Sequence, residues 1–166
     1  MTKYKMKYAV TGHTSGIGKT LFERLSPNVI GFSRSTGYNI NSYADRQRII
    51  NESNDCDVFI NNAPAGYGQV DLFIELFQEW KDKEKTIINV GSRITDIILP
   101  PDRLELMHYQ SQKLILKIMS LRVVGTCKVK HRSFGYVGTE AILKKYPHFT
   151  KADYISIDQA VDIILS

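Results

Sequence analysis

The sequence predicts an α/β fold with a doubly wound parallel sheet of about six strands flanked by helices. Short apolar runs typical of buried strands alternate along the chain with helical patterns. The first run, residues 8–11, leads directly into a glycine-rich turn and a helix, and a later run, residues 57–62, breaks into a polar turn closed by Pro64. Strands separated by helices in this way form parallel sheets with right-handed crossovers.

The helices follow from apolar spacing and from residues that start or stop helices. Pro27 ends a helix at residues 19–25, and Ser42 with Asp45 begins a second helix that ends near Asn54. Residues 70–80 carry a broad apolar stripe, which we expect to pack on the sheet, with a partner subunit as the alternative. We also expect helices at residues 103–121 and 156–165, a loop at residues 134–138, and further strands at residues 28–35, 38–40, 86–90 and 126–130.

Length and composition limit the classes of protein. With 166 residues, 43% of them hydrophobic, the chain suits a single domain, residues 1–166. No apolar run reaches the ~18 residues that a membrane span needs. Cys56 and Cys127 lie far apart in strand-like runs without metal-ligand spacing, so we expect reduced thiols in a cytoplasmic protein.

The net charge of +5 is typical of proteins that bind nucleic acids. The charges alternate along strand-like runs or end helices, so we interpret them as solvated faces and do not expect specific nucleic-acid binding. His131 and His148 fall in such segments, and no His, Cys and Asp cluster has zinc spacing, so no metal is expected. The basic residues are Lys3, Lys5, Lys7, Lys81, Lys83, Lys85, Lys128, Lys130 and Arg132.

The turn at residues 11–18 has the composition of a phosphate-binding turn. Gly12, Gly16 and Gly18 allow backbone N–H groups to approach a pyrophosphate, and the positive end of the following helix favours an anion. A tight turn without a ligand is the alternative for this motif taken alone. The motif predicts a dinucleotide site when it is taken together with suitable residues at the other strand ends.

The end of the second strand indicates which dinucleotide binds. An acidic residue there would bind the 2′-hydroxyl of NAD, whereas Ser33, Arg34 and Ser35 offer a cation and hydroxyl donors suited to a 2′-phosphate. An ordinary exposed arginine at a strand end is the alternative. The segment predicts NADP(H) as the cofactor.

With these motifs the sequence resembles the short-chain dehydrogenase/reductase family. Residues 11–18 match its TGxxxGIG turn, residues 61–63 its NNA strand end, Tyr109 with Lys113 its YxxxK motif, and Ser92 stands where its catalytic serine would. Residues 129–139 resemble its RVN…PGxVxT stretch. The resemblance implies a Rossmann-type sheet and cofactor binding by Gly12, Thr14, Ser15, Gly16, Ile17, Gly18, Ser33, Arg34, Ser35, Asn39, Ile40, Asn62, Ala63, Pro64, Tyr109, Lys113, Val137 and Thr139.

By this resemblance the chain is an unusually short member. A whole crossover helix is missing after the second strand, and the family's last strand is absent. Asn39 replaces an aspartate common near adenine, Phe134 replaces the proline and Lys130 the asparagine of the later stretch. We find no equivalent of the asparagine with which many members hold a proton-relay water. Cofactor binding is therefore better supported than turnover.

Tyr109 and Lys113 are four residues apart and so share a helix face. A free phenol has a pKa near ~10, and one ammonium at ~4 Å would lower it by ~2–3 units. The resemblance implies that Lys113 also holds the nicotinamide ribose hydroxyls and that Ser92 polarises the substrate carbonyl. The alternative is that Tyr109 and Lys113 are only neighbours on a helix surface.

The sequence thus predicts an NADP(H)-dependent oxidoreductase that interconverts a carbonyl and an alcohol on a small molecule by hydride transfer, with Tyr109 as acid/base. The alternative function is an NADP(H)-binding module with little or no turnover. Family members often pair through the helix that carries Tyr109, so a homodimer through that helix is also expected.

Overall fold

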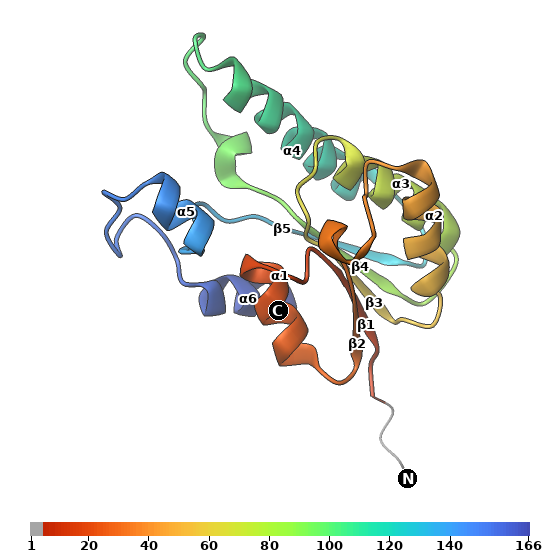
Figure 1. The fold of residues 1–166 in the computed structure, drawn as a ribbon. Helices are drawn as coiled ribbons and strands as arrows, with labels where there is room; N and C mark the ends of the chain where they lie inside the picture. The colour runs from red at the N-terminus through yellow and green to blue at the C-terminus, as the bar shows by residue number, and fades with distance from the viewer. Residues whose placement is uncertain (1–4) are drawn as a thin grey trace.

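Five parallel strands form the sheet of residues 5–166, the part of the chain that the computed structural model describes (Figure 1). The strands are β1 (Tyr8–Thr11), β2 (Val29–Phe32), β3 (Val58–Asn61), β4 (Thr86–Val90) and β5 (Lys128–Arg132), in the spatial order β2-β1-β3-β4-β5. The chain adds β2 on one side of β1 and the later strands on the other. Ligands of doubly wound sheets bind where the strand order reverses in this way, next to β1.

Helices cover both faces of the sheet (Figure 1). One face carries α1 (Gly16–Leu25) and α6 (Ile157–Leu165), and the other carries α2 (Tyr43–Glu52), α3 (Gly68–Trp80) and α4 (Leu104–Arg122). The short helices η1 (Arg34–Thr36), η2 (Arg93–Asp96) and α5 (Glu140–Lys145) lie in the connections. None of the helices in residues 5–166 is both long enough and apolar enough to cross a membrane.

Alternate strand residues supply two separate apolar cores. Ala9, Phe59 and Ile87 face α2, α3 and α4, whereas Val10 and Ile60 face α1 and α6. A parallel sheet buried on both faces needs this continuous apolar character in its central strands. The doubly wound α/β fold class is confirmed.

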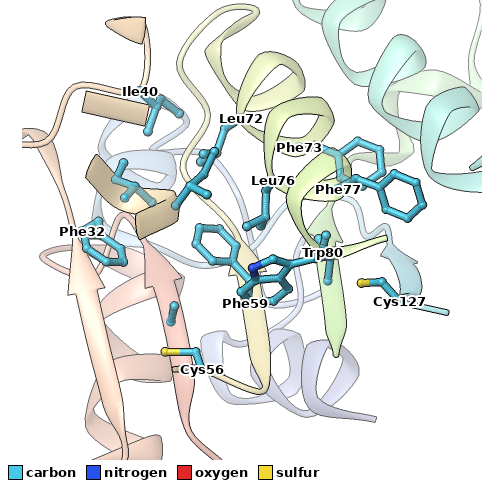
Figure 2. Close-up of a cluster of buried hydrophobic side chains, with 14 of the residues drawn as sticks. Phe32, Ile40, Cys56, Phe59, Leu72, Phe73, Leu76, Phe77, Trp80 and Cys127 are labelled. Atoms are coloured by element: carbon cyan, nitrogen blue, oxygen red, sulfur yellow. The ribbon is translucent and has the colours of Figure 1, made fainter. Parts of the chain in front are cut away.

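The apolar stripe of α3 is buried within the chain. Figure 2 shows Phe73, Leu76, Phe77 and Trp80 directed into the core above the sheet. Trp80 meets Phe59 edge to face, with ring centroids 6.2 Å apart. The expectation of an intrachain core for this stripe is confirmed.

Two expected strands differ in the structure. The segment at residues 38–40 is a turn rather than a strand, because Asn39 N donates to Asp45 Oδ2 and Asn39 Oδ1 accepts from Asn41 N. The last strand begins two residues later than expected, at Lys128, since the N–H groups of Thr126 and Cys127 both donate to the Lys81 carbonyl. The sheet therefore has five strands instead of about six.

The basic residues make different contacts in the structure: some pair with a carboxylate or an aromatic ring, and others are exposed on an edge strand. Lys83 pairs with Glu79 at 2.6 Å, and the Lys85 ammonium lies 4.4 Å from the centre of the Trp80 ring. β5 is an edge strand whose Lys128 is exposed, and charged side chains on an edge oppose pairing with another sheet. Lys3 lies outside the described residues.

A buried arginine connects α2 to α3. Arg46 Nε and Nη2 donate to Glu75 Oε1 at 3.0 and 2.8 Å, and Arg46 Nη1 donates to the Ile40 carbonyl at 3.0 Å. Gln47 Nε2 donates to the other Glu75 oxygen at 3.0 Å. The pair thereby connects the turn at residues 39–41 to the middle of α3.

Removing one member of this pair should lower the free energy of unfolding more than replacing both members does. Glu75→Leu leaves the Arg46 guanidinium, only 9% exposed, with Asp71 3.9 Å away as its nearest remaining carboxylate. We expect Glu75→Leu to lower the free energy of unfolding by about 2–3 kcal/mol. The double variant Glu75→Leu/Arg46→Leu, which leaves no unpaired buried charge, should lose less in total. Urea denaturation of the single and double variants measures the coupling, and additive losses would contradict it.

Candidate functional site

The carboxyl ends of the parallel strands share one edge of the sheet, and most of the predicted site residues follow them. Gly12 follows β1, Ser33 follows β2, Asn62 follows β3 and Ser92 lies two residues beyond β4. Only folding brings these segments together, because they are far apart along the chain.

The glycine-rich turn places a helix N-terminus directly after β1. Gly12 and Gly16 have positive φ angles of 76° and 52°, which favour glycine. A Cβ at Gly18 would lie 2.0 Å from the Gly12 carbonyl oxygen, so α1 approaches the end of β1 only because residue 18 has no side chain. The N-cap Ser15 makes no side-chain capping bond and the first turn of α1 has no acidic residue, an arrangement suited to an anion.

Asn62 and Ala63 bind the end of β1. The N–H groups of both residues donate to Thr11 Oγ1, at 2.9 and 3.0 Å, and Asn62 Nδ2 donates to the Thr11 carbonyl at 3.1 Å. These contacts hold the glycine-rich turn to the end of β3. Pro64 follows in an exposed position.

Three hydroxyl groups form a closed triangle between the glycine-rich turn and the end of β2. Thr14 Oγ1 and Ser33 Oγ are 3.1 Å apart, Ser33 Oγ and Ser35 Oγ 2.8 Å, and Ser35 Oγ and Thr14 Oγ1 3.2 Å. Arg34 between the two serines is exposed, and no ion pair involves it among residues 5–166. The structure therefore joins the predicted residues of two separate segments in one donor-rich patch beside a free guanidinium.

The residues expected near adenine serve the fold in this structure. Ile40 is buried, 5% exposed, in the core under α2 and α3. Asn39 uses its side-chain oxygen within its own turn.

The stretch after β5 returns to the glycine-rich turn. Thr139 caps α5 by accepting from the Ile142 N–H at 3.3 Å, and its Cγ2 would lie 3.4 Å from a Cβ at Gly16. Val137 is buried against α1 and α6 and pairs with Ile155 in an isolated bridge. Thr139 is thus placed beside the turn, as the resemblance implies.

Ser92, Tyr109 and Lys113 come together beyond β4. Burial raises the pKa of Tyr109, and a side-chain hydrogen bond with Ser92 acts in the opposite direction. The Lys113 ammonium lies 5.6 Å from the centre of the Tyr109 ring. Ser92 Oγ also accepts from the Ile94 N–H at 3.3 Å, which fixes the serine at the start of η2.

Lys113 is almost fully buried and binds neutral oxygens. Its Nζ donates to Gln69 Oε1 at 2.6 Å and to the Val90 carbonyl at 3.2 Å, and the residue is 4% exposed. Burial lowers the pKa of Lys113 to about 8. A cation held by neutral groups in a dry environment loses part of the hydration that stabilises its charge.

The expected effect of Lys113 on Tyr109 is not present. The pKa of Tyr109 lies above its ordinary value rather than below it, because burial of the phenol dominates and the opposing influence comes from Ser92. The Lys113 ammonium is directed to Gln69 and Val90 and lies 5.6 Å from the ring centre of Tyr109. This arrangement does not support activation of the phenol by the ammonium, and that activation stays a prediction.

Sequence reasoning missed Gln69 and misplaced His131. We expected the third helix to begin at residue 70, which left Gln69 in a loop, whereas α3 begins at Gly68 and Gln69 is 2% exposed. His131 lies in β5 rather than in a solvated segment, and burial lowers its pKa to about 4. Gln69 follows Gly68, and only Val70 separates it from Asp71, so the local pattern gave no signal of a buried amide.

His13 packs instead of pointing into the turn. Its ring lies 5.0 Å from the Phe22 ring, and its Cγ would be 2.3 Å from a Cβ at Gly31. Within residues 5–166, no group of three or more His, Cys, Asp or Glu residues is placed to hold a metal ion.

No protein-family model and no curated protein matches the sequence. Solved structures do match. A short chain dehydrogenase from Burkholderia cenocepacia J2315 in complex with NADP aligns with a TM-score of 0.75 at 18% identity, over 99% of this chain and 84% of that one. A small-chain dehydrogenase in complex with NADPH aligns with a TM-score of 0.72 at 18% identity, over 98% and 90% of the two chains.

A short-chain dehydrogenase/reductase of unknown function from Caenorhabditis elegans, solved with cofactor, aligns with a TM-score of 0.74 at 18% identity, over 96% of this chain and 86% of that one. The chain therefore has the Rossmann-type fold of the short-chain dehydrogenases/reductases. The resemblance drawn from the sequence motifs is confirmed at the level of the fold.

Proposed function

We propose that this protein is an NADP(H)-dependent oxidoreductase of the short-chain dehydrogenase/reductase type, which interconverts a carbonyl and an alcohol on a small molecule. The observation that carries the proposal is the convergence of Ser92, Tyr109 and Lys113 at the strand edge that also holds the glycine-rich turn. A helix-surface coincidence would not bury Lys113 or place Ser92 against the phenol.

The chain's residues fit the cofactor. The pyrophosphate would bind at the turn from Gly12 to Gly18, where α1 begins without a side-chain cap and without an acidic residue in its first turn. The 2′-phosphate of NADP(H) would bind Arg34 and the hydroxyls of Thr14, Ser33 and Ser35. Two of the similar structures are complexes with NADP or NADPH, which supports the same choice here.

The bound nicotinamide would supply or accept a hydride, and the chain's own residues would manage the proton. Tyr109 would donate its phenolic proton to the carbonyl oxygen, and Ser92 would donate a hydrogen bond to the same oxygen as it gains negative charge. The single hydroxyl proton of Ser92, which lowers the pKa of Tyr109 when it faces the phenol, would turn to the carbonyl oxygen when the substrate binds. Lys113 would hold the ribose hydroxyls, the role that the family resemblance assigns to it.

The second candidate is an NADP(H)-binding module with little or no turnover. One observation favours it: burial raises the pKa of Tyr109 above its ordinary value. Both functions share the cofactor site and differ only in the reaction. Binding and turnover must therefore be measured separately.

Other sequence expectations stay predictions. A cytoplasmic location is supported by Cys56 and Cys127, which are both buried free thiols. A single NAD(P)-binding domain over residues 1–166 is supported by one sheet that joins elements from β1 to β5.

Arg34→Ala should weaken NADPH binding by about 10-fold or more and leave NADH binding nearly unchanged, because it removes a charged hydrogen-bond donor to the 2′-phosphate. Fluorescence titration of both cofactors measures the two dissociation constants. Arg122→Ala, an exposed arginine at the far end of α4, is the matched control. Equal affinities for NADPH and NADH in the unsubstituted protein would refute the assignment.

Tyr109→Phe should reduce NADPH-dependent turnover of a carbonyl panel at least ~100-fold, because the acid is removed while the ring remains. NADPH absorbance follows turnover, and binding is titrated in parallel. Tyr43→Phe, an exposed tyrosine of α2, is the control. Undiminished turnover in Tyr109→Phe excludes the mechanism, whereas tight binding without turnover in the unsubstituted protein favours the binding module.

A homodimer through α4 is the proposed assembly. α4 exposes Leu114, Ile118 and Leu121 along one side, with Ile118 41% and Leu121 72% exposed. Ile118→Asp should convert a dimer into a monomer in sedimentation equilibrium, because it places a charge in an apolar contact. Ile163→Asp on α6 is the control, and a monomeric unsubstituted protein would contradict the assembly.

A further inference from the structure

The contacts of Gln69 define a role that the sequence motifs do not assign. Its Oε1 accepts from Lys113 Nζ at 2.6 Å, and its Nε2 donates to the carbonyls of Asn61 at 2.8 Å and Val90 at 3.1 Å. Lys113 can only donate and the two carbonyls can only accept, so the amide has a single possible orientation. Gln69 therefore presents an oxygen to Lys113 and cannot rotate away without losing all three bonds.

The backbone of Gln69 is fixed by a buried polar network. Asn61 Nδ2 donates to the Gln69 carbonyl and to Asn89 Oδ1, both at 2.9 Å, and Asn89 Nδ2 donates to Ser120 Oγ at 2.9 Å. Ser120 Oγ in turn donates to the Leu116 carbonyl at 2.6 Å. The network begins and ends on α4, and it connects α3 and the strand ends to the helix that carries Lys113.

The titratable groups around Lys113 in the described residues carry no negative charge that could pair with its ammonium. The titratable groups that face it in the described residues are Tyr109 on α4 and His131 on β5. Both are neutral near pH 7, since burial raises the pKa of Tyr109 and lowers that of His131 to about 4. The shorter of the two hydrogen bonds to the ammonium comes from Gln69.

We propose that Gln69 is the positioning residue that holds the Lys113 ammonium at the strand edge, in the place where the oxidoreductase function proposed above requires it. Gln69 acts through Lys113 and does not contact the reacting atoms. The role of Gln69 in catalysis rests on that proposed function, whereas its hydrogen bond to Lys113 can be tested on the protein without cofactor or substrate.

The test follows the pKa of Lys113 by NMR of labelled lysine side chains, without cofactor or substrate. Gln69→Met keeps the size of the side chain but removes the acceptor, so the pKa of Lys113 should fall by about one unit. Gln69→Glu restores an acceptor with a negative charge, so the pKa should rise. Ser120→Ala, at the other end of the same network, should weaken the fold without moving this pKa.

The unsubstituted protein provides a measurement that does not depend on the variants folding. The side-chain amide signals of Gln69 should shift with pH at a midpoint near 8, the pKa of Lys113. The midpoint is far from that of His131 near 4, so the two groups are distinguished. The absence of a Gln69 shift near pH 8, or equal changes in Gln69→Met and Ser120→Ala, would overturn the positioning role.

Turnover measurements distinguish a failure of the positioning role of Gln69 from a failure of the proposed oxidoreductase function. If the protein reduces carbonyls, Gln69→Met should lower kcat by about 10–100-fold, with the basic limb of the pH profile moved in the direction of the Lys113 pKa. If no carbonyl is reduced, the proposed function fails while the NMR result still decides whether Gln69 holds Lys113. An unchanged kcat and pH profile in an active protein would also overturn the positioning role.

Discussion

The close approach of α1 to the end of β1 is the constraint on which the rest of the site depends. Position 18 has no room for a side chain, because a Cβ there would meet the Gly12 carbonyl and, at 2.9 Å, Asn62 Nδ2. The approach brings the start of a helix against two strand ends at once. Asn62 and Ala63 bind Thr11 beside it because β1 and β3 are neighbouring strands, so the turn lies against residues from both.

The site divides into two parts with different physical character. The nucleotide part consists of an uncapped helix start, three hydroxyls and one exposed guanidinium, which are groups that can bind an anion. The reactive part is dry, with Tyr109 half-buried and Lys113 almost fully buried. Asn61 belongs to the strand end of the first part and hydrogen bonds Gln69 in the second, so the two parts are mechanically connected.

Local sequence was sufficient for the features that depend on a few neighbouring residues. Helix α2 begins after Ser42, whose hydroxyl accepts from the Asp45 N–H, and α6 begins after Ser156 with a capping box, as expected. The glycine spacing predicted the turn, and the four-residue spacing of Tyr109 and Lys113 predicted a shared helix face. The boundaries of the last strand were wrong because Lys81, more than forty residues earlier, accepts the N–H groups that would otherwise have started it.

The sequence by itself therefore determined the class of fold and the glycine-rich turn, which follow from spacing and strand order. Its resemblance to a known family indicated the residues that meet beyond the strand ends. Only the tertiary structure decided the chemical environment of those residues. Burial and hydrogen bonding arise between segments distant in sequence, so Gln69 beside Lys113, the raised pKa of Tyr109 and the buried, neutral His131 could not be read from local pattern. Desolvation, which sets these pKa directions, is a property of the packed chain and not of any motif.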